Sequence, residues 1–416
     1  MTMETKQKEQ TEIKKIALYQ LQPLLRSTLG NKLIVENYTT TSFLPPGENY
    51  GSTILAIDAI IRQEEKSERK NLHMIAKMAP PTEFQRRVFN SPFTFRKEIF
   101  MYERLLPYYR LMEKEFGVNE SELFDVIPKY YGSRLSLDPQ LDFDDNAVIL
   151  LENLKTRGYY TGKRDIGVDL DHSKLAVRAL ARFHALGIAM KHNKPDEYDI
   201  IREASKCPEL IKDGFTEFYI PILKHLEENP ATRIHYDRCA VILKDESFFD
   251  EWLAEPEGDW ATIIHKDFWV NNMMFHRDQN GHVDDVKFID FQNYMYSNPV
   301  GEILFFLHSS TDDNVRANNL EELTDLYYEI FISVLLKMKC DIKPFNRKSF
   351  NEQFLSVAKM EFIHLCFMLK MLTIDVDKTN LNNSNMESVM TMYEGNEMYT
   401  KRLESLVLYF VKRNWI

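Results

Sequence analysis

Residues 262–291, TIIHKDFWVNNMMFHRDQNGHVDDVKFIDF, hold two apolar runs separated by Asn280-Gly281. An Asn-Gly pair between apolar runs is a strong sign of a β-hairpin, because both central positions of the favoured turn need positive φ angles. With Asn280 and Gly281 as the loop, Asn272 lies opposite Ile289. The stretch therefore predicts two antiparallel strands joined by a two-residue turn.

Three polar residues lie at the open end of this predicted hairpin. Asn272 and Asp290 stand beside each other on the two strands, and Asp267 precedes the first strand by a short loop. Oxygen ligands gathered on one rim suit a hard cation such as Mg²⁺ together with a phosphate group. Taken singly, Asp267 and Asn272 could equally be a loop cap and a turn residue, so the prediction rests on the set.

The sequence upstream of residue 154 alternates in the manner of β-strands. Strand-like runs are LIVENYTTTSF, STILAIDAIIR, NLHMIAKM, VIPKYYGS and NAVILLENL, with one helical segment, PFTFRKEIFMYERLLPYYRLMEK, after the third. The charged segment QEEKSERK reads as a hairpin connection between the second and third strands. We expect an antiparallel sheet with one helix, preceded by a packing helix within residues 11–29.

After residue 155 the helical period dominates, apart from the hairpin region. Helices are predicted over 171–191, 208–229, 320–338, 350–372 and 387–413, where apolar residues recur at helical spacing. The fold class is therefore α+β. The predicted division is an N-terminal helical extension over 1–30, a sheet-bearing lobe over 31–153 and a mainly helical lobe over 154–416.

Composition excludes several classes of protein. The formal net charge of −11 argues against a duplex nucleic-acid binder, which needs surplus Lys and Arg. Four scattered cysteines without a CxxC pair indicate free thiols in a reducing compartment. The charged N-terminus does not resemble a secretory signal, and no later run has membrane-spanning length without charge. We expect a cytoplasmic protein with no membrane partner.

The hairpin region resembles protein-kinase-like enzymes. His265-Lys266-Asp267, followed after four residues by Asn272, is similar to their catalytic loop, and the triplet DFQ beginning at Asp290 is similar to their metal-binding DFG element. The resemblance implies a two-lobe protein-kinase-like fold that uses ATP and Mg²⁺. It assigns Asp267 as the catalytic base, with Asn272 and Asp290 as Mg²⁺ ligands.

Longer segments resemble one family more closely. HKDFWVNNMMF, LARFHALGIAMK, FTFRKEIFMYERLLP and VILLENL are similar to the ecdysteroid kinase-like family, a choline-kinase-like branch known mainly from insects. The similarity runs from about Asn37 to beyond Ser310. This sequence departs from the pattern at Lys266, where the family usually has Gly, and at Glu302, where a following helix often carries Asp.

The resemblance also implies a nucleotide site. Lys77 ends an apolar strand and is expected to hold the α and β phosphates of ATP, with Glu98 on the next helix as its partner. Glu103 is the competitor for that pairing, but it lies roughly 140° from Glu98 around a helix. We favour Glu98 because its spacing from Phe95 matches the family, although a solvated strand lysine is the commoner fate of a residue such as Lys77.

Two further segments complete the expected nucleotide site. Gly47 and Gly51 lie between the first two strands, where a turn could cover phosphates, although a plain hairpin turn explains them nearly as well. Glu152 and Leu154 follow the last strand of the first lobe, where the hinge of this fold offers backbone groups to adenine. Those contacts use main chain, so the side chains there carry little information.

The remaining interpretations concern histidines and the acceptor. His184 and His265 are read as structural residues, not as acids. No protein-kinase activation segment follows Asp290, since Pro299 and an apolar helix come within a few residues, so the expected acceptor is a hydroxyl on a small apolar molecule such as an ecdysteroid. Choline-like acceptors, a nucleotide-binding pseudokinase and a metal-dependent hydrolase using His265 remain as alternatives.

Overall fold

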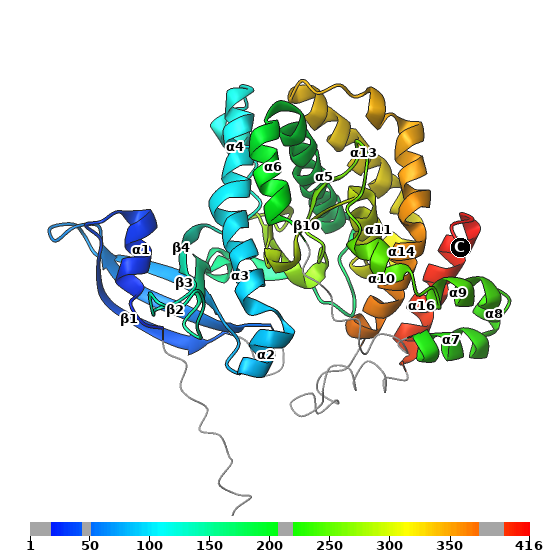
Figure 1. The fold of residues 1–416 in the computed structure, drawn as a ribbon, viewed down its shortest axis with the longest axis horizontal. Coiled ribbons are helices and arrows are strands. Elements are labelled where there is room, and N and C mark those ends of the chain that lie inside the picture. Colours follow the sequence, from blue (N-terminus) through cyan, green and yellow to red (C-terminus); the bar gives the residue numbers. More distant parts are fainter. Residues whose placement is uncertain (1–17, 44–50, 207–218, 374–394) are drawn as a thin grey trace, which may run out of the picture. The chain divides into compact units, whose positions relative to one another are not determined.

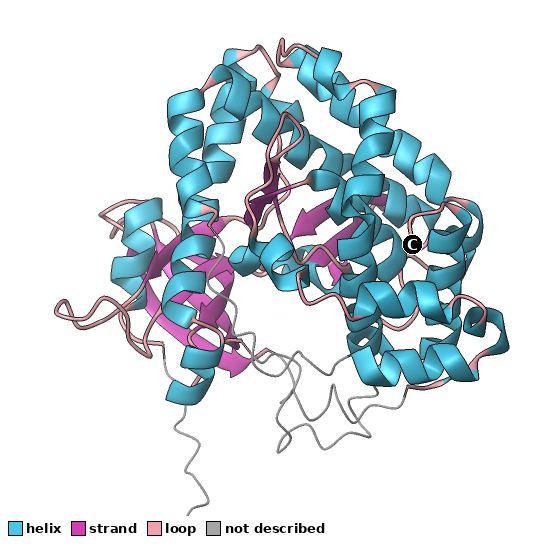
Figure 2. Ribbon diagram, turned by 45° about the vertical axis from the view of Figure 1, so that its right-hand side comes forward, coloured by secondary structure: helices cyan, strands magenta, loops and turns pink. Residues whose placement is uncertain are grey.

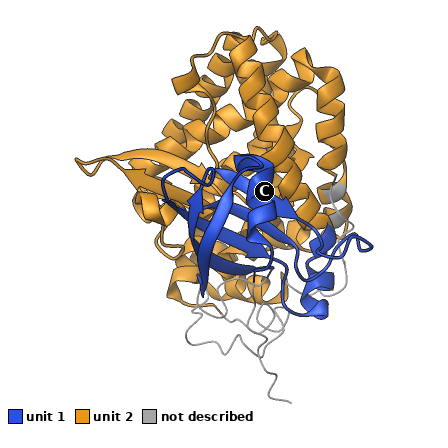
Figure 3. Ribbon diagram, turned by 90° about the vertical axis from the view of Figure 1, so that its left-hand side faces the viewer, with its two compact units in different colours: residues 1–92, 129–153 blue, residues 93–128, 154–416 orange. Residues whose placement is uncertain are grey.

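The computed structural model describes residues 18–43, 51–206, 219–373 and 395–416. The chain divides into two compact units, shown in different colours in Figure 3. The first unit comprises residues 1–92 and 129–153, and the second comprises residues 93–128 and 154–416. The functional boundaries at residues 30 and 153 remain a prediction.

The first unit is built on one antiparallel sheet of five strands in the order β1-β2-β3-β5-β4. Strands β1, β2, β3 and β4 of this sheet are labelled in Figure 1. Its elements are α1 (Leu21–Leu29), β1 (Ile34–Ser42), β2 (Thr53–Arg62), β3 (Lys70–Met78), α2 (Glu83–Val88), β4 (Tyr130–Arg134) and β5 (Val148–Glu152). The five predicted strands are confirmed. The short helix α2 was not predicted, and Thr82 caps it by accepting a hydrogen bond from the Gln85 N–H.

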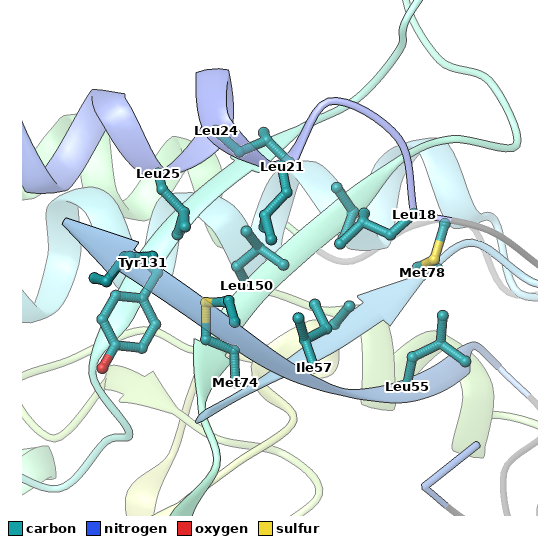
Figure 4. Packing of buried hydrophobic residues seen from close by; sticks show 14 of the residues in the cluster. Leu18, Leu21, Leu24, Leu25, Leu55, Ile57, Met74, Met78, Tyr131 and Leu150 are labelled. Atoms are coloured by element: carbon teal, nitrogen blue, oxygen red, sulfur yellow. The ribbon is translucent and has the colours of Figure 1, made fainter. Parts of the chain in front are cut away.

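Alternating side chains explain why these strands form one sheet. In β2, Leu55, Ile57 and Ala59 are buried, while Asp58 between them is exposed, which is the two-residue period of a sheet with one covered face. Figure 4 shows residues of this core, in which α1 contributes Leu21, Leu24 and Leu25. The predicted packing helix is thus confirmed over Leu21–Leu29, and residues 11–17 lie outside the described residues.

The second unit is mostly helical, as the cyan ribbons of Figure 2 show. Its helices are α3 (Ser91–Phe100), α4 (Leu106–Glu115), α5 (Leu170–Asn193), α6 (Pro195–Ala204), α7 (Tyr219–Glu228), α8 (Pro230–Arg233), α9 (Tyr236–Leu243), α10 (Phe248–Leu253), α11 (Pro299–Ser309), α12 (Asp313–Asn318), α13 (Leu320–Lys337), α14 (Arg347–Thr373) and α16 (Glu397–Lys412). Short strands interrupt them: β6 (Tyr160–Thr161), β7 (Thr262–Ile264), β8 (Met273–Arg277), β9 (Val283–Phe288) and β10 (Met295–Ser297).

The helical segment predicted over 92–114 consists of two helices. A π-helical turn over Met101–Leu105 separates α3 from α4. Pro107 lies two residues beyond this turn, in the first turn of α4. It lacks a backbone N–H, and its ring crowds the carbonyl of the preceding turn, so the widened turn relieves both problems. The sequence period alone did not show this interruption.

The predicted fold class is confirmed as α+β, with the protein-kinase-like pairing of a small antiparallel sheet and a large helical unit. The helices predicted over 171–191, 320–338 and 350–372 correspond to α5, α13 and α14. Those predicted over 208–229 and 387–413 are described only from residues 219 and 395 onwards. Within the described ranges, no helix is both long enough and apolar enough to cross a membrane.

Candidate active site

The hairpin at the centre of the site has the predicted register but a different turn. Asp278 and His282 close a three-residue loop, in which Gly281 has a φ of 84° while Asn280 stays at negative φ. The two-residue Asn-Gly turn was therefore wrong. An extra residue at Asp284 restores the pairing, so that β8 and β9 meet with Met273 opposite Phe288.

Asn272 lies opposite Ile289, as predicted, because the longer loop and the bulge shift the register in opposite directions. The Ile289 N–H donates to the Asn272 carbonyl at 3.0 Å. The Asn272 side-chain Nδ2 donates to both the backbone oxygen and Oδ2 of Asp267, each at 2.9 Å. Since Nδ2 is committed to Asp267, Oδ1 is the Asn272 atom that could bind a cation.

Asp290 follows the end of β9 in a left-handed conformation, with φ 63° and ψ 61°. Such angles are uncommon outside glycine and concentrate at functional sites. The pKa of Asp267 is raised to about 7, first by burial and then by the negative charge of Asp290, against the hydrogen bond from Asn272. Asp267 accepts a hydrogen bond from Asn272, and Asp290 follows Ile289, whose N–H donates to the Asn272 carbonyl, so the three predicted residues lie on one rim.

His265 is a buried residue that contacts both sequence segments of the site. Its Nε2 lies 3.0 Å from the Ile289 carbonyl, and its ring lies 4.5 Å from the Phe291 ring. Burial lowers the pKa of His265, although Glu302 opposes the shift. A neutral buried ring that bonds the backbone of the opposite strand agrees with the structural role predicted for it.

Glu302 on α11 holds the backbone of the catalytic loop. Its Oε2 accepts the His265 N–H at 2.9 Å, and its Oε1 accepts the Lys266 N–H. Lys266 itself has a φ of 71°. One carboxylate therefore fixes the two peptide groups that lead directly into Asp267.

Buried contacts from two other helices hold the Glu302 side chain in place. His184 on α5 places Nε2 at 2.9 Å from Glu302 Oε2 and Nδ1 at 2.7 Å from the Tyr327 hydroxyl on α13. Burial alone would raise the pKa of Glu302, but the hydrogen bond and charge of His184 bring it below its ordinary value. His184 is thus the satisfied core histidine that the sequence predicted.

The part played by Glu302 and Tyr327 was missed in the sequence. The signal was present: Glu302 stands inside VGEILFFLHS, an otherwise apolar helical run in which every residue is buried. A carboxylate enclosed in this way needs partners, because an unpaired buried charge is very costly. Its side-chain partner His184, however, lies on α5, 118 residues away in the sequence, and could not be identified by spacing.

The predicted nucleotide residues lie on both units. Lys77 in β3 is 6% exposed and pairs with Ile54 and Ile149 on the neighbouring strands. On α3, Glu98 is buried and lies 3.4 Å from the Tyr102 hydroxyl, whereas Glu103 is exposed. The pairing of Lys77 with Glu98 remains a prediction.

The other nucleotide candidates have simpler surroundings. Glu152 ends β5 and accepts the Lys129 N–H at 3.3 Å. Leu154 is buried with Tyr159 and Met274 in a small apolar cluster. Gly51 precedes β2 and is partly buried, while Gly47 lies outside the described residues.

The oxygen atoms on the rim suit Mg²⁺ as part of a larger ligand set. Among the described residues, no group of three or more His, Cys, Asp and Glu side chains gathers as a complete metal cage. Asp290 and Asn272 offer one carboxylate and one amide oxygen. Mg²⁺ commonly binds one or two carboxylates together with substrate phosphates and water, so these two residues fit that ion.

Comparison with known proteins gives one family. A profile described as the ecdysteroid kinase-like family matches residues 46–340. No curated protein matches the sequence.

Solved structures show distant likeness. One is a spectinomycin phosphotransferase in complex with ADP and spectinomycin, at 11% identity and a TM-score of 0.40, covering 88% of this chain and 93% of that chain. Another is a GDP complex of an aminoglycoside 2'-phosphotransferase, at 13% identity and a TM-score of 0.36, covering 82% and 95%. At TM-scores below 0.5 these likenesses carry no argument about the activity of this chain.

Proposed function

The chain belongs to the ecdysteroid kinase-like family, and from this premise we propose that it transfers the γ-phosphoryl group of ATP to a hydroxyl group of a small, apolar molecule. The observation that carries the proposal is the gathering of Asp267, Asn272 and Asp290 on one hairpin rim. A carboxylate beside two oxygen ligands is the minimum that phosphoryl transfer needs.

Asp267 is the proposed base. It accepts the proton of the acceptor hydroxyl as that oxygen bonds to the γ-phosphorus and the bond to the β–γ bridging oxygen breaks, releasing ADP. Asn272 holds the Asp267 carboxylate by its Nδ2, which keeps Oδ2 at a fixed place. The backbone hydrogen bonds to Glu302 keep the loop in this geometry.

Asn272 and Asp290 are the proposed Mg²⁺ ligands. When bound, the ion would neutralise the charge of the phosphates that Asp290 faces. Lys77 would hold the α and β phosphates, with Glu98 fixing its ammonium, and Gly47 and Gly51 would let the backbone approach the phosphates. The main chain from Glu152 to Leu154 would receive the adenine.

The proposed acceptor is an ecdysteroid-like alcohol and not a protein. Between Asp290 and α11 the chain makes only one helical turn, Phe291–Asn293, and the three-residue strand β10. This length leaves no room for a segment that could dock an extended peptide. The apolar residues Phe215, Phe218, Tyr219 and Ile222 precede the catalytic loop and are candidates for lining an acceptor pocket. Ile222 is fully buried core and Tyr219 is partly buried, whereas Phe215 and Phe218 lie outside the described residues.

We also propose that the protein works in the cytoplasm without a membrane or nucleic-acid partner. The net charge of −11 supports the exclusion of nucleic acid. The three cysteines within the described residues, Cys239, Cys340 and Cys366, are free and buried, which is compatible with a reducing compartment.

The test of the acceptor class is a panel assayed with ATP and Mg²⁺. Ecdysteroids, choline-like amines and casein are incubated separately with the wild-type protein, and products are read as a mass gain of one phosphate. We expect phosphorylated steroid. Formation of phosphocholine would support the proposed kinase activity but contradict a steroid acceptor. Phosphorylation of casein alone would contradict a small-molecule acceptor. Nucleotide binding without any product would indicate a pseudokinase.

A further inference from the structure

Lys266 directly precedes the proposed base in the sequence and adopts a backbone conformation with a cost. It lies between His265 and Asp267 with a φ of 71°, a region that favours glycine and strains other residues. Its ammonium lies 3.2 Å from the centroid of the Trp252 ring. A long side chain kept in a strained position and seated on an aromatic face calls for an explanation beyond backbone geometry.

Trp252 belongs to an aromatic wall built from three helices. The rings of Trp252 on α10 and His364 on α14 lie nearly perpendicular to each other, with their centroids 4.7 Å apart. His364 in turn stacks on Phe305 of α11 at 4.3 Å, with the two rings within 3° of parallel. Phe305 lies on the same helix as Glu302, so α11 contacts both the aromatic wall and the loop that precedes Asp267.

The surroundings of this wall carry several carboxylates. His364 Nδ1 lies 3.1 Å from Oε2 of the buried Glu361, and Glu302 lies under the loop. The Trp252 ring thus has a neighbour, His364, that is paired with a carboxylate. Such surroundings attract organic ammonium ions, because a tryptophan face and a carboxylate both favour positive charge.

We propose that Lys266 is an internal cation that occupies the Trp252 face and makes the acceptor site discriminate against ammonium-bearing alcohols. A second cation at that ring would meet the lysine ammonium at short range and would find the ring face taken. The site is thereby left to neutral or anionic hydroxyl acceptors. This inference rests on the proposed function, because that proposal supplies the acceptor site. Whether Lys266 occupies the Trp252 ring face can be tested by ligand binding alone, without measuring phosphate transfer.

The test compares two alcohols of the same shape, choline and 3,3-dimethylbutan-1-ol, which differ only in a quaternary nitrogen or carbon. Calorimetry measures the affinity of each for the full chain. In Lys266→Gly and Lys266→Met we expect the affinity for choline to rise about tenfold relative to the neutral alcohol, within the range of a cation–π contact. Adding Trp252→Leu to either variant should abolish the gain.

Lys339→Gly is the matched control. Lys339 is an exposed lysine with a φ of 56° after α13, so its replacement relieves similar strain without touching the wall. It should leave the choline ratio at the wild-type value. Lys266→Met keeps the Cβ and the strain, and therefore separates charge from backbone effects if Lys266→Gly alters folding.

Two results would overturn the proposal. One is an unchanged ratio of choline to neutral alcohol in both Lys266 variants. The other is a loss of ATP binding with no gain for choline, which would place the ammonium on the nucleotide phosphates. Failure of the proposed function would look different, because phosphate transfer would be absent from the wild-type protein while the change in binding ratio persisted.

Discussion

Among single residues, Asp290 gives the most specific prediction for turnover. Its carboxylate is one of the two proposed Mg²⁺ ligands. The backbone of Asp290 has a left-handed conformation just after the end of β9. Asp290→Asn keeps the shape but removes the charge, so we expect Mg²⁺-supported turnover to fall about 100-fold or more. Turnover is measured over a Mg²⁺ titration.

Asp284→Asn is the control for this change. Asp284 lies on the same hairpin and pairs with the partly exposed His276 at 2.7 Å, away from the rim. It should turn over at the wild-type rate. Equal turnover by Asp290→Asn and the wild type at saturating Mg²⁺ would remove Asp290 from the metal site.

The sequence predicted the positions of single residues in the hairpin from its strand pattern and its turn residues. The pairing of Asn272 with Ile289 was predicted correctly, although the turn was not, because the bulge at Asp284 compensated for the longer loop. Asp278 explains the longer loop: its Oδ1 accepts the N–H groups of Asn280 and His282. That capping competes with the two-residue turn and is hard to weigh from an Asn-Gly pair alone.

At the scale of elements, Gly187 sets how closely α5 approaches the strand that leads into the catalytic loop. A Cβ added at Gly187 would lie 2.1 Å from Oγ1 of Thr262 in β7 and 2.8 Å from the Tyr109 hydroxyl. Gly to Ala in a helix interior ordinarily stabilises by about 1 kcal/mol. Here we expect Gly187→Ala to destabilise by about 1–3 kcal/mol, because the overlap outweighs propensity.

Denaturant unfolding of the variant measures this sign directly. Adding Thr262→Ala should recover part of the loss, since it removes the nearer of the two crowded atoms. A Gly187→Ala protein as stable as the wild type would mean that α5 can move away from β7 without cost.

Elements were predicted best where the period was long and uniform. The buried stripe of α5 and the alternating strands β2 and β3 are visible in the sequence because local burial follows the helical or strand period. The π-helical turn before Pro107 and the support of Glu302 by His184 and Tyr327 were not visible. The turn is a local effect of Pro107 that the apolar period does not register, whereas the support of Glu302 comes from distant residues that a local period does not encode.

His308 gives a pH dependence that belongs to the whole molecule. Burial, followed by the charges of Arg316, Arg413 and Arg402, lowers the pKa of His308 to about 3. An unfolded histidine titrates near 6.5, so between these values the unfolded state binds a proton that the folded state does not. Stability therefore falls with falling pH, by about 1.4 kcal/mol per pH unit from this residue.

The measurement is the free energy of unfolding of wild type and His308→Gln at several pH values from 7 to 4. Whatever His308→Gln costs at pH 7, that cost should shrink as the pH falls, because the variant lacks this penalty. His192→Gln, at an exposed position, is the control. Parallel stability curves for wild type and His308→Gln would contradict the shifted pKa.

The predicted pairing of Lys77 with Glu98 is tested by replacing each residue alone and both together. If Glu98 fixes the Lys77 ammonium, replacing either residue by Ala should lower kcat/KM for ATP, and replacing both should cost little more. Glu103→Ala should be nearly neutral, since Glu103 is exposed. Fully additive losses, or a larger loss from Glu103→Ala, would contradict the proposed pairing.

The central claim is that Asp267 is the base of an ATP-dependent transfer to a small hydroxyl acceptor. The most direct measurement follows the γ-phosphate of labelled ATP into a metabolite pool with Mg²⁺, comparing wild type with Asp267→Ala. We predict a product heavier by one phosphate from the wild type, and about 100- to 10,000-fold slower formation in the variant. Equal rates in the two proteins, or no labelled product from the folded wild type, would contradict the account.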